Sequence, residues 1–80
     1  MPTVLRIGPY IFLFFSSDYG EPPHIHIQRD KDLAKFWLTP ISCAYNKRFP
    51  DHELNKIEKM VIQNSQYLLE KWHEYFNFRI

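Results

Sequence analysis

Two histidines, His24 and His26, stand two positions apart directly after a loop that ends in Pro22-Pro23. Residues 24–29 are typical of a strand, and side chains alternate between the two faces of a strand. The two imidazoles are therefore expected on the same face. Imidazole titrates near neutral pH and is a common metal ligand, so the pair could transfer protons or bind a metal ion.

The first hypothesis is a small, metal-independent endoribonuclease in which His24 and His26 are an acid/base pair. One imidazole would take the proton of a ribose 2′-hydroxyl while the other, protonated, supports the leaving oxygen. A cation must then stabilise the charge that develops on the phosphate. By sequence, the nearby cations are Arg29, Lys35 and Arg6. This mechanism needs no metal and no cofactor.

The second hypothesis is a metal-binding protein, because a His-x-His pair on a strand can supply two ligands. Zinc needs a third or fourth ligand. The available donors are Asp18, Glu21, Glu58 and His73, and the spacing does not select among them. A third interpretation is a solvated strand face on which the histidines form hydrogen bonds with their neighbours. The sequence leaves all three open.

Lys35 and Trp37 are expected on one face of a strand over residues 33–38, with Ala34, Phe36 and Leu38 on the other. If the face of Lys35 also carries the two histidines, an aromatic ring would lie beside a cation and two imidazoles. Such a surface could stack a base of single-stranded RNA and hold its phosphate. The pairing register decides this, and the sequence does not fix it.

The elements that would position these residues form an α+β domain. Strands are expected over 4–7, 10–15, 24–29 and 33–38, and 41–45 is either a fifth strand or a helical turn. From Asp51 the apolar period changes to about 3.6 residues, which predicts one long amphipathic helix reaching Phe76. The expected fold is a small antiparallel sheet of four to five strands with this C-terminal helix packed on one face. A helix of this length must either bend, most easily at Asn64-Ser65, or overhang the sheet.

Two further features of this helix suggest roles. Glu58 lies within its apolar stripe, where a carboxylate must be paired or reach water. Glu58 could pair with Arg6 or orient a histidine, in a supporting role, or lie at the edge of the stripe. An overhanging helix end would leave aromatic side chains partly exposed as a partner interface. These side chains are Trp72, Tyr75, Phe76 and Phe78. They suggest the alternative of a non-enzymatic interaction module.

Size and composition limit the function classes. The 80 residues predict a single domain over 1–80, and the net charge of +1 gives no global signature of a polyanion-binding protein. A single cysteine, Cys43, permits no internal disulfide, and no signal peptide is apparent. The longest apolar run, from Tyr10 to Phe15, is too short to span a membrane. We therefore expect a cytoplasmic protein without membrane contact, whose oligomeric state the sequence leaves open.

Four segments together resemble one known family. They are residues 2–8 (PTVLRIG), 22–27 (PPHIHI), 34–38 (AKFWL) and 72–76 (WHEYF). The chain is similar over nearly its whole length to the Domain of Unknown Function 4160 family of small bacterial proteins. Members are often encoded beside a short protein of the Domain of Unknown Function 2442 family. The resemblance implies a toxin–antitoxin-like pair in which this chain is the candidate toxin and binds a small cognate protein. It implies no catalytic residue.

Overall fold

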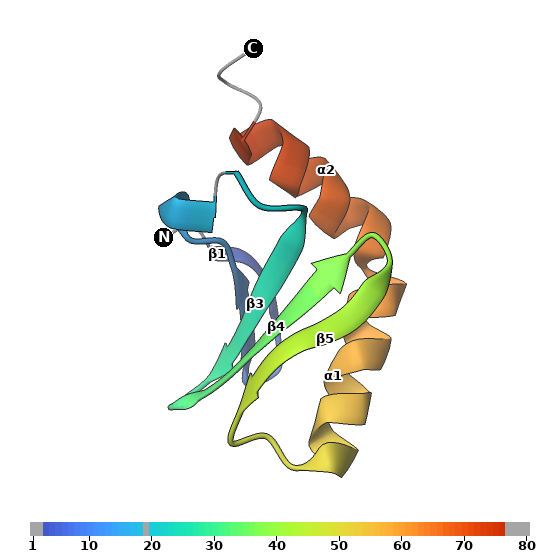
Figure 1. Ribbon diagram of the computed structural model, residues 1–80. Helices are drawn as coiled ribbons and strands as arrows, with labels where there is room; N and C mark the ends of the chain where they lie inside the picture. Colours follow the sequence, from blue (N-terminus) through green and yellow to red (C-terminus); the bar gives the residue numbers. More distant parts are fainter. Residues whose placement is uncertain (1–2, 19, 77–80) are drawn as a thin grey trace.

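Over residues 3–18 and 20–76, which are the residues that the structure describes, the computed structural model contains a five-stranded antiparallel sheet followed by two helices (Figure 1). This confirms the predicted α+β fold. The elements are β1 Thr3–Ile7, β2 Tyr10–Leu13, a short 3-10 helix η1 Ser16–Asp18, β3 His24–Arg29, β4 Asp32–Leu38, β5 Ile41–Lys47, α1 Asp51–Gln63 and α2 Ser65–Phe76.

The sheet is a meander in which each strand pairs with the next in the order β1-β2-β3-β4-β5. Short turns join β1 to β2, β3 to β4 and β4 to β5, whereas a longer segment that contains η1 joins β2 to β3. Gly8 in the first turn has a φ of +55° that favours glycine. The segment that the sequence left undecided is β5, which lies at an edge of the sheet. A register shift separates its pairs Lys35–Tyr45 and Phe36–Cys43.

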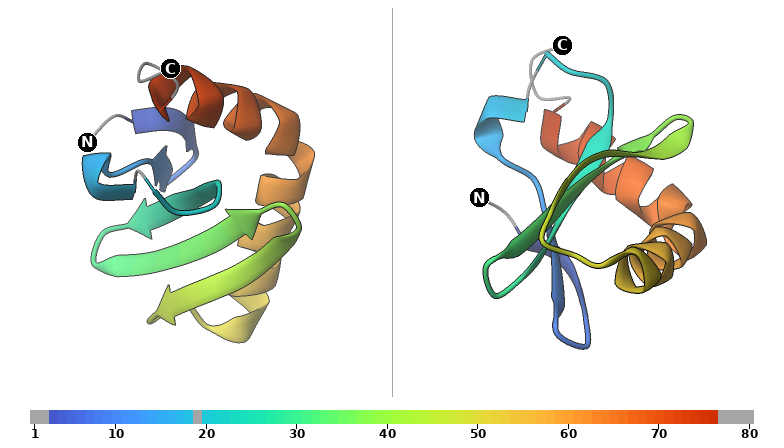
Figure 2. Two further views of the ribbon diagram at one scale, coloured as in Figure 1. Left: turned by 45° about the horizontal axis from the view of Figure 1, so that its top comes forward. Right: turned by 60° about the horizontal axis from the view of Figure 1, so that its bottom comes forward.

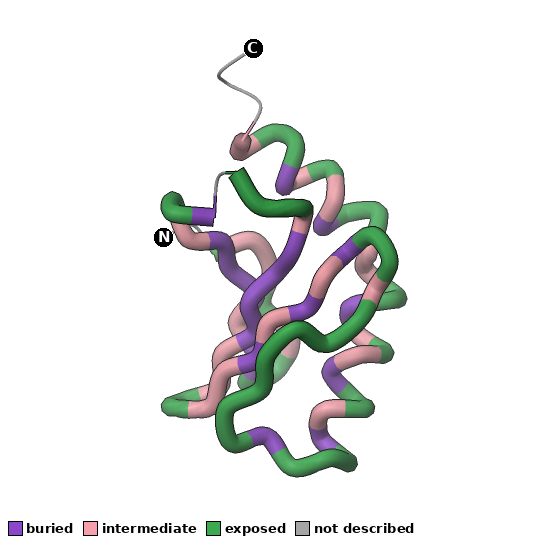
Figure 3. The backbone as a smooth tube through the Cα atoms, viewed as in Figure 1, coloured by how far each residue is buried: buried purple, intermediate pink, exposed green. Residues whose placement is uncertain are grey.

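Both helices pack on one side of the sheet and enclose the core there (Figure 2). The helix-facing side chains of the sheet include Phe12, Ile25, Ile27, Ala34 and Phe36, all of which are fully buried. Ile57, Val61 and Leu68 from the helices meet them. Each large apolar side chain buried in this way contributes about 1.5–3 kcal/mol to folding. Figure 3 shows the buried positions on the helices alternating with exposed ones, as an amphipathic pattern requires.

The single long helix predicted from the sequence is divided into α1 and α2 at Asn64. This residue has φ −111° and ψ 13°, outside the helical range, and its side-chain amide donates to the Met60 carbonyl at 2.8 Å. The break falls at the poor helix formers expected to bend. It lets α2 follow the sheet, so the radius of gyration is 11.9 Å, close to the value of about 12 Å for a compact chain of this length. Neither described helix is long and apolar enough to cross a membrane.

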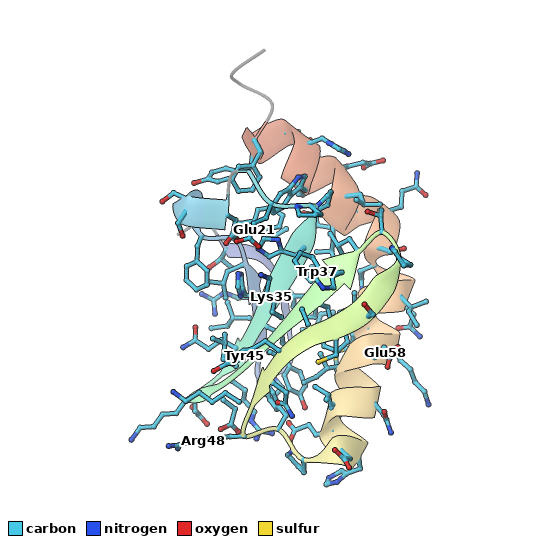
Figure 4. All side chains as sticks on the ribbon, viewed as in Figure 1. Glu21, Lys35, Trp37, Tyr45, Arg48 and Glu58 are labelled. Carbon is cyan, nitrogen blue, oxygen red and sulfur yellow. The ribbon has the colours of Figure 1, made fainter. Side chains whose placement is uncertain are left out.

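The side of the sheet away from the helices, which we call the open face, carries His24, His26, Lys35 and Trp37. His26 lies directly opposite Lys35, and His24 lies directly opposite Trp37. Directly opposed residues of an antiparallel pair point to the same side. The register therefore places Lys35 and Trp37 on the same face as the two histidines, which the sequence alone had left open. Lys35 in turn lies opposite Tyr45 of β5, and Figure 4 shows Lys35, Trp37 and Tyr45 along the front of the sheet.

Candidate functional site

The turn formed by η1 places Asp18 beside the first residues of β3. The backbone of this turn closes on itself, because the Asp18 N–H donates to the Phe15 carbonyl at 3.0 Å. One carboxylate oxygen, Oδ2, accepts a hydrogen bond from the Phe15 N–H at 2.8 Å. Asp18 is only 5% exposed. The carboxylate is therefore fixed, and its second oxygen, Oδ1, is free to face the histidines.

His24 is fully buried, and its ring nitrogens have distinct surroundings. Nδ1 lies 2.9 Å from the Pro22 carbonyl oxygen, which can only accept a hydrogen bond. Nδ1 therefore carries the proton, and in the neutral ring Nε2 is left with a lone pair. The ring is held in place by Trp72 at 5.0 Å and Trp37 at 5.5 Å between ring centroids.

The carboxylate and both imidazoles converge at one point. Asp18 Oδ1 lies 3.1 Å from Nε2 of His24 and 3.4 Å from Nε2 of His26. One ligand atom from each of the three residues lies within 4.8 Å of the others. Although His24 Nε2 is close to the carboxylate, it has no hydrogen-bond partner of acceptable geometry among the described residues, and neither has Nδ1 of His26. We call Asp18, His24 and His26 the buried triad.

Burial lowers the pKa of the His26 imidazole below its ordinary value, and the opposing effect of the Asp18 carboxylate is smaller. The His26 ring also packs against Phe15, with 4.4 Å between ring centroids. Near neutral pH, His26 is therefore in the uncharged form that binds metal ions.

A charged pair borders the buried triad on the open face. Lys35 Nζ lies 2.8 Å from a Glu21 carboxylate oxygen and 4.5 Å from the centre of the Trp37 ring. The hydrogen bond from Lys35 lowers the pKa of the Glu21 carboxyl. In Figure 4, Glu21 lies near the upper end of β3 and Lys35 lies below it, over the same strand. The cation expected beside the histidines is thus present, but it already has a carboxylate partner.

The sequence profile of a family described as Domain of unknown function (DUF4160) matches residues 9–73 of the 80-residue chain. The chain belongs to the DUF4160 family. No curated protein and no solved structure matches it. The matched region of this DUF4160 domain includes the buried triad, Lys35 and Trp37. The family membership expected from the sequence is thereby confirmed, and the association with a second short protein stays a prediction.

Arg29 of the DUF4160 domain is not brought together with the histidines. It alternates with them along β3 and therefore points to the helix-facing side, where its guanidinium pairs with Glu53 and, at 2.8 Å, with Asp32. Its odd sequence spacing from His24 and His26 already implied the opposite face. Arg29 cannot hold a phosphate bound beside the triad.

Arg6 and Glu58 are also apart from the triad. Arg6 is exposed on the edge strand β1, on the open face, where it lies opposite Ile11. Glu58 is half-buried on α1, on the other side of the sheet. Within the part of the chain that the structure describes, no contact joins Glu58 to Arg6 or to a histidine. This position agrees with the interpretation that Glu58 lies at the edge of the apolar stripe.

Among the described residues of the predicted partner interface, Trp72 is buried in the core and Tyr75 and Phe76 are partly exposed. Trp72 is only 6% exposed, and its ring meets Phe14 edge to face at 5.3 Å. Tyr75 and Phe76 are half-buried against the same Phe14 ring. Phe78 lies outside the described residues. The break at Asn64 explains this outcome, because it returns α2 to the sheet.

The sequence did not single out Glu53, the buried carboxylate of α1. It is 8% exposed, accepts a hydrogen bond from the Tyr10 hydroxyl at 2.6 Å, and pairs with Arg29. The sequence contains a signal for this burial, because Glu53, Ile57 and Val61 are spaced by four residues and therefore lie on one stripe of the helix. Asp18 was among the possible metal donors, and only the conformation of the loop selects it.

Proposed function

We propose that this protein binds a divalent transition-metal ion of the zinc class through Asp18, His24 and His26. The observation that carries the proposal is the Nε2 atom of His24. This buried nitrogen lies 3.1 Å from a carboxylate oxygen without forming a hydrogen bond to it. Two acceptors at this separation repel each other unless a cation lies near both.

The pattern around His24 is typical of a metal ligand. Ligating histidines generally donate their other ring N–H to a carbonyl or carboxylate, which fixes the tautomer and the ring orientation. Here the Pro22 carbonyl accepts that N–H. A proton shared between His24 and Asp18 is the alternative, but the hydrogen-bond geometry for it is poor.

The two separations between the Asp18 oxygen and the histidine nitrogens suit a tetrahedral ion, and all three donor atoms lie within 4.8 Å of one another. With bonds of about 2.0–2.1 Å, the ligand atoms of a tetrahedral zinc site lie about 3.4 Å apart. Oδ1 of Asp18 lies 3.1 and 3.4 Å from the two histidine nitrogens. Two nitrogens and one carboxylate oxygen suit zinc and its neighbours rather than calcium or magnesium. Three protein ligands leave a fourth position for water or a substrate, as in catalytic zinc sites.

Metal binding can be tested by titrating chelator-treated protein with Co²⁺, whose visible absorption reports tetrahedral coordination, and then displacing it with Zn²⁺. We expect one equivalent to bind, and His24→Ala and Asp18→Asn to weaken binding at least about tenfold. His73→Ala is the matched control because His73 is exposed on α2. Asp18→Asn preserves shape, and circular dichroism checks the folding of every variant. Equal binding by the Asp18→Asn variant and the control would reject the site.

The toxin-like endoribonuclease with a cognate antitoxin-like partner stays a prediction. His26 shares the open face with Lys35, which supports it, whereas the full burial of His24 keeps that ring from direct contact with RNA. Growth of a bacterial host that expresses the wild type or the His24→Ala/His26→Ala double variant tests it. Arrest by the wild type alone would favour the nuclease.

A further inference from the structure

We propose that the open face of the sheet binds single-stranded nucleic acid, with bases stacked on Trp37 and Tyr45 and phosphates held by cations of the same face. This inference does not rest on the metal site. The cations are Arg6, Lys35 and Lys47, from β1, β4 and β5. The pairing register places all three side chains on the face that the helices leave free.

The formally charged side chains that the strands place on this face are all basic. Arg6 belongs to the cross-strand row Arg6–Ile11–Gln28–Leu33–Lys47, and Lys35 belongs to the row Leu13–His26–Lys35–Tyr45. Among the described strand residues, none that points to the open face is acidic. Asp32 points to the opposite side, where it pairs with Arg29. A polyanion can therefore lie across the strands although the net charge of the chain is only +1.

The aromatic side chains lie where bases could reach them. Tyr45 is 51% exposed on β5, and Trp37 is partly exposed on β4, diagonally next to it. Lys35 lies between them, opposite Tyr45 and against the Trp37 ring. Every base has a flat face, so stacking on such rings tolerates any sequence, and a neighbouring cation holds the phosphate. A sheet face with exposed aromatic rings is also a known geometry for single-stranded RNA.

A carboxylate from the loop before β3 would compete with a nucleic-acid phosphate for Lys35. The Glu21 carboxylate forms an ion pair with Lys35, with 2.8 Å between Oε1 and Nζ, and the Glu21 side chain is 47% exposed. Solvent-exposed ion pairs of this kind contribute little stability and exchange readily. A phosphate can therefore replace the carboxylate on Lys35, and removal of the Glu21 charge should strengthen binding.

The test is fluorescence anisotropy of dye-labelled oligouridine and oligothymidine of about ten nucleotides, within the usual length of such sites. Metal-free and zinc-loaded protein are both titrated at several salt concentrations. Binding is expected in both forms. With three phosphate contacts, the logarithm of the association constant should fall with the logarithm of salt concentration with a slope of about −2. Preference for oligouridine over oligothymidine would assign the face to RNA.

Substitutions on the open face test whether the oligonucleotide binds there. Trp37→Ala and Tyr45→Ala should each weaken binding about fivefold or more, whereas Glu21→Gln should tighten it. Tyr67→Ala is the matched control, because Tyr67 is 41% exposed on α2 and has a lysine, Lys71, 5.5 Å from its ring centre. This control repeats the aromatic–lysine pair on the helical side of the molecule, and its affinity should equal that of the wild type.

Three outcomes would overturn the inference. They are absence of binding at low salt, equal losses in the Tyr45→Ala and Tyr67→Ala variants, and weaker binding by Glu21→Gln. A protein that binds one zinc ion but no oligonucleotide would leave the proposed function standing without this surface. A protein that binds oligonucleotide but no metal would do the reverse.

Discussion

The buried polar side chains of this domain lie near the two ends of β3, and the two groups differ in how well they are satisfied. At its beginning, Nε2 of His24 lacks a hydrogen-bond partner within the described residues. At its end, Glu53 is bound by Tyr10 and Arg29. A buried polar group that is fully paired contributes to stability, whereas an unpaired one is expected to have a function.

Removing the Glu53 charge should therefore weaken the fold. Glu53→Gln leaves Arg29 without one of its two carboxylates and replaces a charged acceptor of the Tyr10 hydroxyl. We expect the free energy of unfolding to fall by about 1–3 kcal/mol. Urea denaturation measures it. Glu58→Gln on the same helix, half-buried and at the edge of the stripe, should change stability by less than about 0.5 kcal/mol. Similar losses in both variants would contradict this account of Glu53.

The environment of the Tyr10 phenol leads us to expect a loss of stability at high pH. Burial, followed by the hydrogen bond to Glu53 and its charge, raises the pKa of the Tyr10 phenol above its ordinary value of about 10. Above that value the folded state retains a proton that the unfolded chain has released, so the free energy of unfolding falls as the pH rises. Denaturation at pH values between about 9 and 11 should show a steeper fall for the wild type than for Tyr10→Phe. Tyr45→Phe, at an exposed position, should retain the wild-type slope.

At the scale of elements, α2 is fixed to the sheet through its buried side chains Leu68 and Trp72. Trp72 contacts β3 through His24 and packs against Phe14. Trp72→Ala should lower the free energy of unfolding by about 3–5 kcal/mol, a large part of the stability of so small a domain. Thermal denaturation measures the loss. His73→Ala, one position along and exposed, should leave the melting temperature nearly unchanged. A stable Trp72→Ala domain would reopen the hypothesis that Trp72 serves a partner.

The patterns that predicted elements correctly were local ones. Alternation separated Lys35 and Trp37 from Ala34 and Phe36, and poor helix formers marked the break at Asn64. The features that the sequence could not settle depended on contacts between distant segments. The burial of Trp72 follows from the direction that α2 takes after the break. The selection of Asp18 depends on a loop whose backbone bonds no periodicity reveals.

For the whole molecule, metal binding should couple to folding, because the ion would join the loop at Asp18 to β3. A ligand that binds only the folded state stabilises it by RT ln(1 + [L]/Kd), about 2.7 kcal/mol at a hundred times the dissociation constant. Saturating Zn²⁺ should therefore raise the melting temperature by roughly 10–20 °C. Differential scanning fluorimetry measures this.

The matched comparison is Asp18→Asn, in which the same Zn²⁺ concentration should leave the melting temperature within a few degrees of the metal-free value. An unchanged melting temperature of the wild type after Zn²⁺ addition would count against the metal site. An equal rise in the variant would place the ion elsewhere.

The order of the elements has a consequence for biosynthesis. Every strand precedes both helices along the chain, and synthesis proceeds from the N-terminus. The ribosome therefore releases the whole meander before it releases the segment that covers the meander. During that interval three side chains that are fully buried in the finished domain are exposed to solvent or to a chaperone. They are Phe12, Ile25 and Phe36. Premature termination between β5 and α1 would leave the apolar face of the sheet permanently exposed. Such fragments would be natural substrates for quality-control proteases.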